Sequence, residues 1–82
     1  MENDIFKLIN LFRGIFSKNF NINILDDRIE VFYGEKSITV KTHDFLYEVV
    51  SVIFYILNCE KQKLNVEDML SNYLLYTSVN MF

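Results

Sequence analysis

Residues 20–41 read FNINILDDRIEVFYGEKSITVK. Apolar and polar side chains alternate through this stretch, which is the period-two pattern of strands that bury one face. The alternation is interrupted twice by residues that favour turns, DD at residues 26–27 and GEK at residues 34–36. Because turns this short join antiparallel neighbours, the stretch predicts a three-stranded antiparallel meander with one covered face. The expected strands are residues 20–24, 28–33 and 37–41.

The alternation also predicts which side chains share a face of the sheet. The expected inward residues of the second and third strands are Ile29, Val31, Tyr33, Ile38 and Val40. The expected open face consists of Asn21, Asn23, Arg28, Glu30, Phe32, Thr39 and Lys41. A second layer must cover the apolar face, since a sheet that is apolar on one side has to bury that side.

Before the meander, residues 4–17 repeat apolar side chains at spacings of three and four, which predicts an amphipathic helix. Asn3 is the expected N-cap. Gly14 indicates either a close backbone approach or an early end of the helix. Phe6 and Leu11 widen the apolar stripe to roughly 220° of the helical wheel. This stripe has four interpretations: part of the core, a dimer seam, a surface for a partner helix, or a membrane-surface helix.

After the meander, residues 44–59 contain many β-branched side chains that would also suit a strand. The polar residues favour a helix, because Glu48, Ser51 and Asn58 trace one narrow helical stripe. A helix with so thin a polar stripe is expected to be buried on most sides and to lie at the centre of the fold.

Polar residues mark the starts of both C-terminal helices. Thr42 or Asp44 is the expected N-cap of the second helix. The third helix, residues 66–77, follows Asn65 as its N-cap, with Asp68 at the N3 position of a variant capping box.

The predicted order is α-β-β-β-α-α, so residues 1–82 are expected to form a single α+β domain with the helices packed on one face of the meander. Residues 78–82 form a tail that packs back or frays. The first two helices present more apolar surface than three strands can cover. Either the helices pack heavily on one another or a second chain covers the excess, which leaves a monomer and a homodimer as alternatives.

Composition and charge restrict the function classes. The chain has 82 residues, of which 51% are hydrophobic, and a net charge of −3. Its hydrophobic content is not that of a disordered chain, and it has no basic stripe to displace the counterions of nucleic-acid phosphates. No run approaches the roughly 20 apolar residues of a membrane span. A single cysteine cannot form an internal disulfide, so we expect a cytoplasmic protein. Because the basic stripe and the long apolar run are both missing, we expect that it binds neither nucleic acid nor membrane directly.

Residue sets for catalysis or metal binding are missing from the sequence. His43 and Cys59 are expected at opposite ends of a helix about 24 Å long, too far apart for a catalytic dyad. One histidine and one cysteine do not supply the four ligands of a zinc site. The acids near Asp26 lack the spacing of a calcium loop. We therefore expect no enzymatic activity, no metal and no cofactor.

Two features remain that could bind a partner protein. Acidic side chains gather in and beside the turns of the meander, as in proteins that occupy a basic groove. An aromatic ring on the open face is typical of interface anchors. An ordinary solvated hairpin, balanced by Arg28 and Lys36, is the alternative interpretation. The candidate partner-binding residues are Asp26, Asp27, Glu30, Phe32 and Glu35.

The order of elements, from Asp4 through the strands ending at Lys41 to the helix pair beginning at Asp44, resembles small phage-encoded inhibitors, including certain anti-CRISPR proteins. The small size and acidic bias are similar as well. The resemblance implies a non-enzymatic blocker of an effector nuclease or another host nucleic-acid enzyme. It includes no shared sequence motif, so it assigns no residue a role.

The leading hypothesis is a small intracellular binding protein, encoded by a phage or another mobile element, that occludes a functional surface of a larger host protein such as a CRISPR effector nuclease. The alternative is a homo-oligomeric structural or assembly protein that associates through the apolar surface of its first two helices. A third interpretation is a regulator that contacts DNA through Lys7, Arg13 and Lys18.

Overall fold

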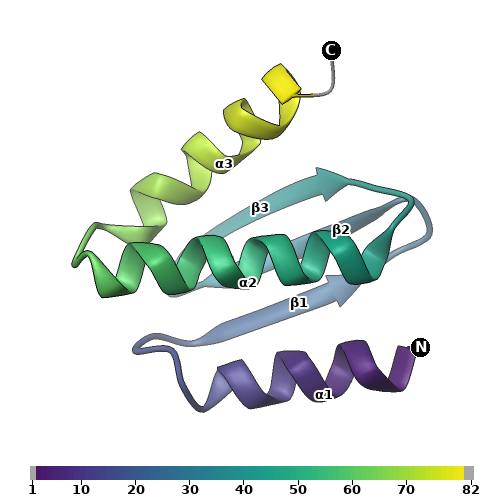
Figure 1. Cartoon of the computed structure of the whole chain (residues 1–82), viewed down its shortest axis with the longest axis horizontal. Helices are drawn as coiled ribbons and strands as arrows, with labels where there is room; N and C mark the ends of the chain where they lie inside the picture. Colours follow the sequence, from purple (N-terminus) through teal and green to yellow (C-terminus); the bar gives the residue numbers. More distant parts are fainter. Residues whose placement is uncertain (1, 81–82) are drawn as a thin grey trace.

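The computed structural model describes the backbone of residues 2–80 and the side chains of residues 3–74. Over this range the chain forms three helices and a three-stranded antiparallel sheet in the order α-β-β-β-α-α (Figure 1), which confirms the expected α+β class. The elements are α1 (Glu2–Arg13), β1 (Phe20–Ile24), β2 (Arg28–Tyr33), β3 (Lys36–Lys41), α2 (Phe45–Lys61) and α3 (Val66–Asn80). The tail expected at residues 78–82 is helical as far as Asn80, and residues 81–82 lie outside the described part.

The helices form one layer and the sheet forms the other. Figure 1 shows α2 over the middle of the sheet, α1 beside the β1 edge and α3 beside the β3 edge. The contacts agree with this view, since α1 packs on β1, α2 on β2 and α3 on β3, and α2 also touches both other helices. The central position predicted for the second helix is therefore confirmed.

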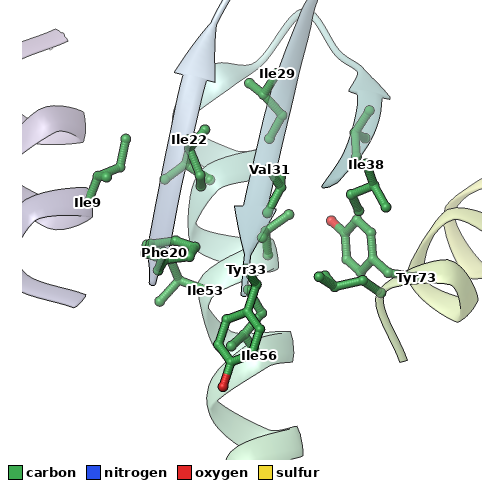
Figure 2. Packing of buried hydrophobic residues seen from close by; sticks show 14 of the residues in the cluster. Ile9, Phe20, Ile22, Ile29, Val31, Tyr33, Ile38, Ile53, Ile56 and Tyr73 are labelled. Atoms are coloured by element: carbon green, nitrogen blue, oxygen red, sulfur yellow. The ribbon is translucent and has the colours of Figure 1, made fainter. Parts of the chain in front are cut away.

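The strand register joins the inward side chains into rows. Ile22 of β1 lies opposite Val31 of β2, which lies opposite Ile38 of β3. All three are buried in one core with side chains from the helices, among them Ile9, Ile53 and others shown in Figure 2. The side chains predicted for the open face are exposed or half-buried. Because side chains alternate with a period of two, a slip of one residue would turn this row to solvent, and burial therefore fixes the register.

The second turn of the meander is one residue tighter than predicted. Lys36 pairs with Tyr33, so β3 begins at residue 36 and only Gly34 and Glu35 connect the strands. Gly34 has a φ of +59°. The first central position of a two-residue hairpin favours such a φ, and glycine adopts it without steric penalty.

The limits of α1 differ from the prediction at both ends. The helix begins at Glu2, so Asn3 lies inside it and its prediction as the N-cap is wrong. It ends at Arg13 rather than at residue 17. Gly14 follows directly, which agrees with its interpretation as an early helix end, because glycine disfavours helix continuation.

Phe16 reaches the core without belonging to a helix. Its ring packs edge-on against Phe20, with the ring centroids 4.9 Å apart, and against Tyr33 at 6.2 Å. The neighbouring Ile15 is left exposed. Apolar spacing predicted the burial of Phe16 correctly, but aromatic packing on the sheet holds this ring in place of a further helical turn.

Side chains cap the two C-terminal helices as predicted. Asp44 caps α2, since its Oδ1 accepts a hydrogen bond from the backbone N–H of Tyr47 at 3.1 Å. Asn65 caps α3 in the same way, with its Oδ1 accepting from the N–H of Asp68 at 3.1 Å. Each cap satisfies a helix donor that would otherwise lack a partner and is worth about 1 kcal/mol.

The C-terminal end of α2 places Lys63 in the left-handed region, with a φ of 59°. The N–H of Leu64 donates to the carbonyl of Cys59 at 3.0 Å, and the N–H of Lys63 donates to the carbonyl of Glu60 at 3.1 Å. These two bonds are the pattern of a Schellman motif, whose left-handed position prefers glycine because a Cβ is crowded there.

We expect Lys63→Gly to stabilise the fold by about 0.5–1 kcal/mol, because relief of the left-handed strain exceeds the added entropy of the unfolded chain. Lys61→Gly removes the same charge at the last residue of α2, where the backbone is helical, and should not stabilise the fold. Urea unfolding of both variants measures the two effects. Equal free-energy changes would contradict the role of Lys63 in this cap.

Candidate partner-binding surfaces

Phe32 lies on the open face of the sheet, in the central strand and near the end that leads into the β2–β3 turn. It is half-buried in the central strand β2. Its cross-strand partners are Asn21 of β1 and Ser37 of β3, both of which are small and polar. The buried rows on the other side of the strands fix the position of this ring, so the face is a rigid platform with one aromatic side chain among polar ones.

The five candidate residues do not form one cluster. Asp26 and Asp27 are exposed in the turn between β1 and β2, and Glu30 lies in β2 on the same face as Phe32. Glu35 lies in the turn at the other end of β2. The six residues of this strand separate the two turns by roughly 20 Å. The structure thus brings Glu30 and Phe32 together and leaves Glu35 apart from the two aspartates.

Basic side chains are interleaved with the acidic ones on the open face. Arg28 and Lys41 lie opposite each other in the register. Arg28 Nη1 is 3.9 Å from Asp27 Oδ1, and both side chains are about half exposed, so this ion pair contributes little to stability. The open face therefore carries charges of both signs.

Arg13 is a contributor to the open face that the sequence did not reveal. Its guanidinium donates hydrogen bonds to Asn10 in α1 and to Asn21 on the open face of β1. The contact depends on α1 lying beside the β1 edge, and no local pattern in the sequence carries that information.

Glu35 belongs instead to a shallow depression between the sheet and α3. Its backbone N–H donates to Glu67 Oε2 at 3.0 Å, and Lys18 Nζ lies 2.6 Å from Glu67 Oε1. The hydrogen bond from Lys18, followed by that from Glu35, lowers the pKa of the Glu67 carboxyl. The depression is lined by Ser17, Lys18, Asn19, Gly34, Glu35 and Glu67. Because Glu67 binds both Lys18 and the backbone of Glu35, this region connects α3 to the segment before β1 and to the turn between β2 and β3.

A second surface lies on the outer side of α2, where Tyr47 is 67% exposed and Phe54 is 57% exposed. The sheet, α1 and α3 cover the other sides of this helix, which agrees with the expectation that it is buried on most sides. Part of its polar stripe is turned toward α3, where Tyr73 donates a hydrogen bond to Glu48 and the Tyr55 hydroxyl donates to the carbonyl of Met69 at 2.6 Å. Burial, and then the bond to Glu48, raises the pKa of Tyr73.

A second tyrosine–glutamate contact holds the other end of α2. Tyr33 of β2 donates a hydrogen bond to Glu60, and the hydroxyl and N–H of Ser17 both donate to Glu60 Oε2 at 3.0 Å. Burial, and then the bond to Glu60, raises the pKa of Tyr33. The carboxylates of α2 thus bind neighbouring elements at both ends of the helix, which fixes its rotation about its own axis.

The described residues contain no group of three histidine, cysteine or acidic side chains placed to hold a metal ion. His43 precedes α2 and is exposed, whereas Cys59 is buried near the other end of that helix. Burial raises the pKa of the Cys59 thiol, which disfavours the reactive thiolate. Among the described helices, none has the length and apolar character needed to cross a membrane.

No protein-family model matches this chain, and the searches of curated proteins and of solved structures also found no match. The inference of function therefore depends on the two surfaces described above, the open face of the sheet and the outer side of α2.

We expect Lys18→Met to raise the pKa of Glu67, because it removes the hydrogen bond that lowers this pKa most. Lys36→Met is the matched control and should change the pKa less, since Lys36 acts only through its charge. An NMR titration of the Glu67 carboxyl measures both. An unchanged titration midpoint in Lys18→Met would contradict the contact.

Because the folded-state pKa of Glu67 lies below its ordinary value of 4.5, the ionised carboxyl stabilises the fold above that pH. This contribution is lost as the pH falls through the folded-state value. Glu67→Gln should therefore lose less stability than the wild type on acidification below pH 4.5, as followed by thermal unfolding.

Tyr73→Phe should destabilise the fold by about 1–3 kcal/mol, because it leaves the half-buried Glu48 carboxylate without its donor. Tyr47→Phe removes a hydroxyl from an exposed residue of α2, the helix that contains Glu48, and should change the free energy of unfolding by less than about 0.5 kcal/mol. Denaturant unfolding distinguishes the two variants. Similar small effects would show that the Tyr73–Glu48 bond does not hold α2 against α3.

Proposed function

We propose that this protein is a non-enzymatic binding protein that covers a functional surface of a larger protein, and that the open face of its sheet makes the contact. The observation that carries the proposal is Phe32, a half-buried aromatic ring held among polar side chains on the face opposite the helices. An apolar anchor within a polar rim is the common anatomy of a protein–protein interface.

The charges of this face indicate which charges the partner's matching surface carries. Glu30 lies beside Phe32, and Asp26 and Asp27 extend from the end of β2, whereas Arg28 and Lys41 lie opposite each other near the same end. The matching surface has an apolar pocket for the ring, with basic groups toward Glu30 and the aspartates and some acidic groups toward Arg28. Complementary charges of this kind guide association and register more than they raise affinity.

The similarity in element order to small phage-encoded inhibitors selects the partner to test first, a host nucleic-acid enzyme such as a CRISPR effector nuclease. In this proposal the protein is encoded by a phage or another mobile element and acts in the host cytoplasm. A blocker of this class needs neither a catalytic residue nor a cofactor, since occlusion of the partner's surface is sufficient for inhibition.

The test is a pull-down from bacterial lysate with the tagged protein, read by mass spectrometry. Phe32→Ala should reduce recovery of the partner about tenfold or more, as expected for an interface anchor. Leu64→Ala is the control, since it removes an exposed apolar side chain between α2 and α3, away from the open face, and it should leave recovery unchanged. The charge reversal Asp26→Lys with Asp27→Lys should also reduce recovery.

Thermal unfolding of the same variants separates loss of binding from loss of folding. Equal recovery of one protein by the wild type, Phe32→Ala and the charge-reversal variant would contradict the assignment of the open face as the binding surface.

A further inference from the structure

The outer side of α2 carries an apolar repeat that the fold covers only in part, since Leu57 packs against the core and the aromatic rings of the repeat are exposed. Tyr47, Val50, Phe54 and Leu57, here called the outer stripe, follow one another at spacings of three, four and three residues. Lys61 continues the pattern four residues later. Tyr47 and Phe54 are mostly exposed, and Val50 and Leu57 are half-buried. A 3-4-3-4 repeat is the heptad spacing with which one helix packs lengthwise on another.

The two aromatic rings of the outer stripe lie on the solvent side of α2 together with the polar residues Asn58 and Lys61, whereas an ordinary surface helix turns mainly polar side chains to solvent. On one flank of α2, Glu48 and Tyr55 are hydrogen-bonded to α3. The side of α2 that faces the sheet is buried in the core. The remaining side is the outer stripe. The hydrogen bonds to α3 hold this rotation, so the stripe cannot turn inward without breaking them.

We propose that the outer stripe is the seam of a homodimer in which two α2 helices pack antiparallel about a two-fold axis. In antiparallel packing of heptads, Tyr47 of one copy lies against Leu57 of the other, and Val50 lies against Phe54. The axis then passes between Val50 and Phe54. All four residues of the stripe are used, and each contact occurs twice, as two-fold symmetry requires.

Charge complementarity selects a second copy and this direction. The same register places Lys61 of one copy opposite residues 43–44 of the other, beside the exposed carboxylate of Asp44. The two helix dipoles also oppose each other, so the positive end of each helix adjoins the negative end of its neighbour. A parallel pair would place Lys61 against Lys61 and Asp44 against Asp44, which is repulsive.

The available area indicates a weak dimer. With roughly 200 Å² for an aromatic side chain, the exposed fractions of Tyr47 and Phe54 leave about 250 Å² of these two rings to bury in each copy. A standard stable interface buries about 800 Å² per partner. The seam alone is smaller than this, so we expect weak and reversible association, with a dissociation constant of about micromolar to millimolar.

Leu11 of α1, which packs beside α2, adds to the seam and is 57% exposed. It lies about 160° around α1 from Arg13, at 100° per residue. Since Arg13 reaches over the open face of the sheet to Asn21, Leu11 lies on the flank turned toward the outer side of α2.

The dimer would present two open sheet faces pointing away from each other, because the helices and the open face lie on opposite sides of the sheet. If the open face binds a partner as proposed above, the dimer is bivalent and gains avidity on a partner with paired sites. This consequence depends on the proposed function, whereas dimerisation itself does not.

Sedimentation velocity of the purified full chain over micromolar to millimolar concentrations tests the dimer. We expect the wild type to dimerise reversibly and Phe54→Asp to weaken association at least tenfold. Phe6→Asp places the same charge at an exposed ring of α1, on the flank near Arg13, and should dimerise like the wild type. A monomeric wild type throughout, or equal association of Phe54→Asp and the wild type, would overturn the proposal.

Cysteine cross-linking tests the direction of the helices. A mixture of Tyr47→Cys and Leu57→Cys should form the mixed disulfide on mild oxidation, whereas Leu57→Cys alone should not cross-link to itself. Self-cross-linking of Leu57→Cys would overturn the antiparallel register.

Because purified protein is used, this result is independent of the pull-down with Phe32→Ala, so a failure of the dimer and a failure of the binding proposal are distinguishable. Capture of a different protein that is lost in Phe54→Asp, with a monomeric wild type, would assign the stripe to that partner instead.

Discussion

The rotation of α2 about its own axis is the constraint on which the other features depend. Its inward residues cover the sheet, and its two acidic side chains accept hydrogen bonds from Tyr73 of α3 and Tyr33 of β2. A half-buried carboxylate without a donor is costly, so both bonds resist any turn of the helix. Once this rotation is fixed, α1 and α3 have one flank each of α2 to pack on.

Two surfaces of opposite character follow from this arrangement. All the helices lie on one side of the sheet, which leaves the side with Phe32 open. Glu48 and Tyr55 of α2 are bound within the molecule, and the rings of Tyr47 and Phe54 in the outer stripe are left facing solvent. A single layer of helices on a three-stranded sheet thus separates a polar face with one aromatic anchor from an apolar helical seam.

The features predicted correctly from the sequence are local ones. The strands, their inward faces and the caps Asp44 and Asn65 each depend on a few neighbouring residues. The Asn3 cap and the start of β3 are local features that were predicted wrongly. Other differences depend on tertiary contacts: Phe16 leaves the helical pattern to pack on the sheet, and Glu48 of α2 is bound by α3. The candidate site was predicted in part, since the sequence identified Phe32 and Glu30 but not Arg13, and it grouped Glu35 with residues at the other end of β2.

The orientation of α2 is tested most directly by nuclear Overhauser effects in the protein labelled at its methyl groups and aromatic rings. This orientation predicts effects between Ile53 and the buried side of β2, and between the rings of Tyr55 and Tyr73, which pack with their centroids 5.0 Å apart. It predicts none between Phe54 and Val31 of the same chain. Effects that join the Phe54 ring to Val31 would contradict the account, because they would place the outer stripe in the core.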